Sequence, residues 1–200
     1  MEVPCLALRV SGWAAWRLYA RHAVGSGSGL LRLSIGLIGV IGAGSLTFHT
    51  IATHWAAWLN IVPILAIMLV YLWLLLTRFI GWSATASAIA LLAFFALTFT
   101  IERVVPVTFL AGGAMYLPAV AVLLGFALIF HLRLRPTADR AFGLATLVFL
   151  ASYTARTLDA PLCDNWLLGT HFLWHLLNAL LLYQLVRFAV LHDPHARNLT

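Results

Sequence analysis

The chain has 200 residues, of which 63% are hydrophobic and only 9% are charged, and its mean hydropathy is +0.99. Charged residues make up about 25% of a typical soluble domain, so this composition excludes that class. The 12 basic residues are all arginines, against 6 acidic residues. Such an excess is typical of the cytoplasmic loops of helical membrane proteins, so we expect no nucleic-acid partner.

The first 28 residues differ from the rest of the chain. Residues 1–20 are moderately apolar but include Glu2, Arg9 and Arg17, and no positive cluster precedes them, which disfavours a cleavable signal peptide. The stretch is also short for a full span. We expect a short or interfacial helix, or the remnant of a membrane helix, followed by a flexible Gly-Ser turn at residues 25–29.

Six later stretches are predicted to be membrane spans. They cover residues 31–53, 58–77, 83–101, 116–132, 141–154 and 168–190. Asn60 and Pro63 suit the first turn of the second span, and a polar loop with Arg156 and Asp159 is expected before the sixth. The sequence thus predicts an all-α fold, a polytopic membrane helix bundle. It forms one domain over residues 29–192, with a cytoplasmic tail at 193–200.

Histidines stand near the ends of the first and the last of these spans. His171 and His175 lie one helical turn apart on one face, and Ser45 and His49 have the same spacing. Ionisable side chains inside a membrane are costly and usually mark a functional site, so we favour a metal site. Two alternatives remain: hydrogen bonds from the pair to neighbouring helices, and an interfacial position for His49.

The arginines predict the orientation of the bundle. Because consecutive spans alternate in direction, two arginines fall on one side and most of the others on the opposite side. By the positive-inside rule the arginine-rich side is cytoplasmic, and the C-terminus lies there. His49, His171 and His175 then share a similar depth toward the non-cytoplasmic face. The arginines on the cytoplasmic side are Arg17, Arg21, Arg32, Arg78, Arg133, Arg135, Arg140, Arg187 and Arg197, and those on the other are Arg103 and Arg156.

Three imidazoles with an open fourth position are typical of catalytic zinc rather than structural zinc. Neutral ligands leave Zn²⁺ its full charge, so the ion can lower the pKa of a bound water molecule to about 7. Asn60, Asp159 and Asp164 approach the same membrane face, where they could act around the ion. The basic residues, which are exclusively arginine, are typical of a GC-rich bacterial genome, so we expect a multi-pass protein of a bacterial inner membrane.

Four segments together resemble the alkaline ceramidase family, within a superfamily of membrane hydrolases that includes the adiponectin and progestin receptors. They are Ser-Leu-Thr-Phe-His at 45–49, Asn-Ile-Val-Pro at 60–63, Asp-Ala-Pro-Leu-Cys at 159–163 and Gly-Thr-His-Phe-Leu-Trp-His at 169–175. The resemblance covers about residues 30–190. Each segment is short, but their order and spacing together are specific.

The resemblance implies a seven-helix bundle, here with a shortened first helix and six full spans. It implies zinc held by His49, His171 and His175, with Ser45 beside the ion and Asp159 in a neighbouring polar loop. It also implies a membrane-lipid substrate: hydrolysis of the amide bond of a ceramide-like lipid to a fatty acid and a sphingoid base.

Two departures from the family matter for that reaction. The family has an acidic residue where Asn60 stands, and only residues 11–21 match the end of its first helix. The chain could therefore begin late, and the family's calcium site is not carried over. Ser45 could stabilise the oxyanion, and the general base should be a carboxylate. An amide accepts protons poorly, so that role is vacant unless Asp159 or Asp164 reaches the site.

Other interpretations of these residues stay open. Ser45 could serve helix packing, and Asp159 could cap a loop or pair with Arg156. The protein could be a catalytically weak, zinc-binding receptor-like or structural relative, which Asn60 favours. A haem-binding membrane protein is a remoter alternative, because paired histidines can ligate haem; His171 and His175 on one helical face suit a single ion better.

Overall fold

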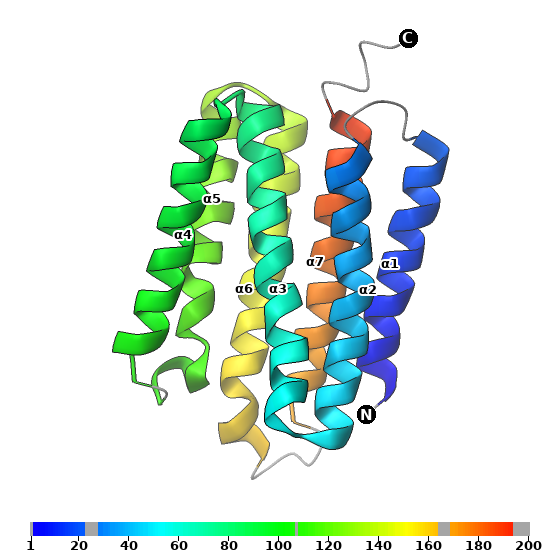
Figure 1. Ribbon diagram of the computed structural model, residues 1–200, viewed down its shortest axis with the longest axis vertical. Coiled ribbons are helices and arrows are strands. Elements are labelled where there is room, and N and C mark those ends of the chain that lie inside the picture. Colours follow the sequence, from blue (N-terminus) through cyan, green and yellow to red (C-terminus); the bar gives the residue numbers. More distant parts are fainter. Residues whose placement is uncertain (1, 23–27, 107, 164–168, 194–200) are drawn as a thin grey trace. The chain divides into compact units, whose positions relative to one another are not determined.

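The computed structural model describes residues 2–22, 28–106, 108–163 and 169–193. The described residues contain seven α-helices and no strand, so the all-α expectation is confirmed. Figure 1 shows the helices, whose bounds are α1 (Glu2–His22), α2 (Ser28–Ile51), α3 (His54–Leu74), α4 (Ala84–Val104), α5 (Leu117–Leu132), α6 (Pro136–Cys163) and α7 (His171–His192). A π-helical segment, η1 (Leu75–Ile80), continues α3, and two short 3₁₀ segments, η2 (Phe109–Gly112) and η3 (Ala114–Tyr116), precede α5.

Six of these helical segments are long and apolar enough to cross a membrane. A span needs about 20 apolar residues, and the six candidates have 19 to 27. This confirms a multi-pass membrane protein. The candidates are Gly29–Ile51, His54–Ile80, Ala84–Val104, Ala114–Leu132, Pro136–Leu162 and His171–His192.

The N-terminal helix is longer than the short helix expected from the sequence. α1 has 21 residues, as many as α4, although it is not among the candidate spans of the described residues. It packs along α2, with Leu8 beside Gly42 and Gly12 beside Ile38, and Leu8, Ser11 and Ala15 are buried. The predicted Gly-Ser turn and the tail lie largely outside the described residues.

The chain divides into two compact units, Met1–Leu92 with Val186–Thr200, and Ala93–Leu185. In the first unit α2 packs against α1 and α3. The last turns of α7 and the residue after it contact η1. Arg78 forms a salt bridge with Asp193, and the rings of Phe79 and Phe188 lie 5.1 Å apart.

In the second unit α5 and α6 pack closely. Three phenylalanines, Phe126, Phe130 and Phe142, form a buried aromatic cluster between them, with ring centroids 5.2 to 6.0 Å apart. Phe130 and Phe142 are fully buried, so they anchor this pair of helices.

Two boundaries differ from the expectation. α3 begins at His54, after the N-cap residue Thr53, so Asn60 and Pro63 lie in its second and third turns and not in the first. α6 continues to Cys163, so Arg156 and Asp159 lie on a helix and not in a loop. The later residues of the expected loop, Asp164 and Asn165, lie outside the described residues.

Candidate metal centre

α7 carries two of the predicted ligands in its first two turns. Its first residue is His171, two residues after Gly169, whose positive φ of 57° turns the chain into the helix. The rings of His171 and His175 have centroids 4.9 Å apart and are inclined at 73°. His175 is buried and His171 is half-buried. Helical spacing alone places both imidazoles on one face.

α2 carries the third predicted ligand near its C-terminal end. His49 is half-buried and lies one turn after Ser45, which is completely buried. The helix ends two residues later at Ile51, and the ring of Phe48 lies 5.7 Å from the imidazole of His49. Ser45 and His49 therefore share one face of α2, as the sequence predicts.

His49, His171 and His175 each offer one ring nitrogen, and these nitrogens all lie within 4.8 Å of one another. In a tetrahedral zinc site with Zn–N bonds of about 2.0 Å, the ligand nitrogens are about 3.3 Å apart. These three histidines are a group that could hold a metal ion. Imidazole binds zinc, copper, iron and nickel alike, so the donor set admits several metals.

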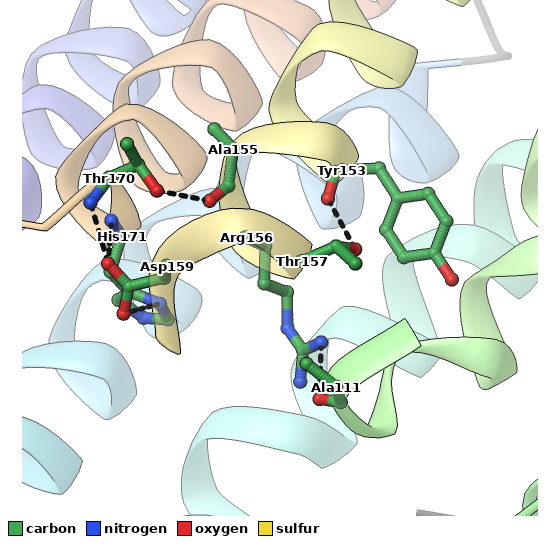
Figure 2. A network of polar contacts seen from close by, with 8 residues as sticks. All are labelled: Ala111, Tyr153, Ala155, Arg156, Thr157, Asp159, Thr170 and His171. Carbon is green, nitrogen blue, oxygen red and sulfur yellow. Dashed lines mark hydrogen bonds and ion pairs between the residues drawn. The ribbon is translucent and has the colours of Figure 1, made fainter. Parts of the chain in front are cut away.

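Asp159 links α6 to the start of α7 (Figure 2). Its Oδ1 accepts hydrogen bonds from the backbone N–H groups of Thr170 and His171, at 2.6 and 2.8 Å. Its Oδ2 lies 4.0 Å from Nδ1 of His171. The first N–H groups of a helix have no partner within the helix, so this carboxylate caps α7 from another element. A loop cap was one of the alternatives left open for Asp159; here the residue caps α7 from a helix, α6.

Two more hydrogen bonds join the same helices. The hydroxyl of Thr170 donates to the carbonyl of Ala155 at 2.6 Å, and the hydroxyl of Ser152 donates to the carbonyl of Trp174 at 3.0 Å. Ser152, Ala155 and Asp159 follow helical spacing along one face of α6. This face therefore contacts the first turns of α7, where both histidines lie. Ser152 and Thr170 were not identified from the sequence. The helical spacing of residues 152, 155 and 159 could have indicated a polar face on α6.

Arg156, on the next face of α6, holds the segment before α5. Its Nη1 donates to the carbonyl of Ala111 at 3.0 Å, and its guanidinium lies 5.7 and 5.8 Å from the ring centroids of Tyr116 and Trp174. The hydroxyl of Tyr153 donates to the carbonyl of Gly113 at 2.9 Å. These contacts order the polypeptide beside the first turns of α7.

Asn60 and Ser45 lie on neighbouring helices of the first unit. A Cβ added at Gly44, the residue before Ser45, would lie 3.2 Å from Cα of Asn60 and would clash with the carbonyl oxygen of Leu59. The backbones of α2 and α3 therefore come close at the level of these two predicted catalytic residues. Asn60 is half-buried.

Comparison with known proteins adds no relative. A scan against protein-family models finds no match, and a search of curated proteins finds none either.

Proposed function

We propose that this protein is a zinc-dependent membrane amide hydrolase that cleaves a ceramide-like lipid to a sphingoid base and a fatty acid. The observation that carries the proposal is the group of three histidines in a membrane-type helix bundle. Three neutral nitrogen ligands leave one position open, as in catalytic zinc sites. The substrate class rests on the resemblance to the alkaline ceramidases.

Zinc held by the three histidines would polarise the amide carbonyl and acidify a water molecule. Ser45, one turn before His49 on the same face of α2, would donate its hydroxyl hydrogen to the oxyanion that develops at the carbonyl. Loss of one such donor typically lowers turnover about 10² to 10³-fold. Ser45→Ala should therefore reduce hydrolysis while zinc stays bound.

The attacking water must lose a proton to a base, and this chain has Asn60 where the ceramidases have an acidic residue. A positioned base adds roughly 10² to 10⁴-fold, and the amide of Asn60 is a poor base. We therefore expect slow hydrolysis by the wild type. The same feature favours the second candidate, a zinc-binding membrane protein with a receptor-like or structural role.

The test is hydrolysis of a short-chain ceramide by the purified wild type, Asn60→Asp and Asn60→Asp/His175→Ala. Asn60→Asp is nearly isosteric and should raise the rate at mildly alkaline pH without changing zinc content. The double variant should be inactive.

Equal rates for the first two proteins would show that Asn60 does not occupy the position of the base. Inactivity of all three, with zinc bound to the first two, would contradict the hydrolase proposal and favour the non-catalytic candidate.

A further inference from the structure

We propose that Asp159 is a positioning residue of the metal centre: it orients the imidazole of His171 so that Nε2 is the nitrogen offered to the ion. The inference rests on the metal-binding part of the proposed function and not on hydrolysis. It differs from the general-base role expected from the sequence.

The placement of Asp159 is fixed by the fold. The carboxylate projects from α6, which continues through this position to Cys163. Two backbone N–H groups, at 2.6 and 2.8 Å, hold its Oδ1. Hydrogen bonds to a charged acceptor are stronger than neutral ones, and the N-terminus of a helix favours a negative charge. The carboxylate is therefore held at the start of α7.

The second oxygen of this carboxylate faces the metal ligand. Oδ2 lies 4.0 Å from Nδ1 of His171, and the dashed line in Figure 2 marks this pair. The separation is about 1 Å longer than a hydrogen bond, so a small displacement of the imidazole would bring the two atoms to hydrogen-bond distance. Histidines that bind metals usually donate their other ring N–H to a carboxylate or a carbonyl, which fixes the tautomer. Asp159 is placed to accept that hydrogen from Nδ1.

The position also argues against Asp159 as the base of the reaction. A general base must give up its charge to a proton during each turnover. The Oδ1 of Asp159 already accepts the two backbone N–H groups that it caps, and its Oδ2 faces Nδ1 of His171. Because both oxygens of Asp159 are engaged in this way, the residue is better placed to orient His171 than to accept a proton from water.

The test compares the zinc affinity of wild type, Asp159→Asn and Ser152→Ala by competition with a chelator. Asparagine keeps an oxygen that can accept the two backbone N–H groups, but it loses the charge that faces Nδ1. We expect Asp159→Asn to bind zinc about 10- to 100-fold more weakly, the usual effect of removing such a partner. Ser152→Ala is the matched control, because it removes a hydrogen bond between the same helices without touching His171. It should keep the wild-type affinity.

A second readout is the visible spectrum of the cobalt-substituted protein, which reports the ligand geometry. Asp159→Asn should shift it, whereas Ser152→Ala should not. Wild-type zinc affinity and an unchanged cobalt spectrum in Asp159→Asn would overturn the proposal. So would equal losses in both variants, which would indicate general loosening of the two helices. Neither measurement uses hydrolysis, so a protein that binds zinc as expected but lacks amidase activity would contradict only the proposed function.

Discussion

Gly44 sets how closely α2 and α3 approach beside Ser45. A Cβ at this position would clash with the carbonyl of Leu59 and lie 3.2 Å from Cα of Asn60, whereas one at Gly39, on the same helix, would meet nothing within 4 Å. Small residues at such crossings allow close packing in membranes. Gly44→Ala should therefore lower the thermal midpoint in detergent by several degrees, since it forces two backbones apart.

Gly39→Ala is the matched control for that substitution. Alanine favours a helix over glycine by about 1 kcal/mol, so the thermal midpoint of this variant should stay the same or rise. A Gly44→Ala protein as stable as Gly39→Ala would mean that the two helices are not in close contact at this level.

Residue types and helical spacing singled out the three histidines of the candidate metal centre. Ionisable side chains are rare in membrane spans, so His49, His171 and His175 stood out, and their positions in alternating spans placed them at one depth. The role of Asp159 could not be predicted in this way. Its partners, the backbone N–H groups of Thr170 and His171, are 11 and 12 residues away, and no local pattern specifies which helix start a carboxylate caps.

The salt bridge between Arg78 and Asp193 ties η1 to the residue that follows α7. Both side chains are largely buried, with relative exposures of 14% and 8%. Removing one partner of such a pair leaves a buried charge unpaired and typically lowers the free energy of unfolding by about 3 to 5 kcal/mol. Replacing both partners with apolar residues can leave the stability nearly unchanged. Arg78→Leu and Asp193→Leu should each destabilise the protein more than the double substitution does.

This prediction is tested by thermal unfolding of the three variants in the same detergent. Destabilisation of the double variant equal to the sum of the single effects would contradict it, because additive effects indicate that the two side chains do not interact.

Helix boundaries were harder to predict than the helices themselves. Polar residues interrupt the apolar pattern at Arg156 and Asp159, which made a loop the natural expectation, yet each finds a partner on a neighbouring segment and α6 continues. Asn60, a residue type that is common at helix starts, lies inside α3, whose N-cap residue is Thr53. Apolar periodicity locates a span, but tertiary contacts decide where its helix ends.

Orientation in the membrane is a prediction for the whole molecule. Arginine counts place the segment at residues 133–140 in the cytoplasm and the segment at 159–165 on the opposite side. Cysteines introduced at Arg135 and at Asn165 should therefore differ in labelling by a membrane-impermeant thiol reagent in intact cells, with only the second accessible. The background would be a protein without its own cysteines, Cys5 and Cys163.

The opposite labelling pattern would show that the arginine count misleads for this chain. It would move the three histidines to the cytoplasmic half of the membrane and leave their ligand set unchanged.

We propose that His49, His171 and His175 together hold one metal ion, a claim that the zinc content of the purified protein tests. Wild type should carry about one zinc per chain. His175→Ala should lose it, whereas His192→Ala, at the other end of the same helix, should keep it. Circular dichroism would confirm that each variant remains helical. A metal-free wild type, or full zinc occupancy in a folded His175→Ala protein, would contradict the claim.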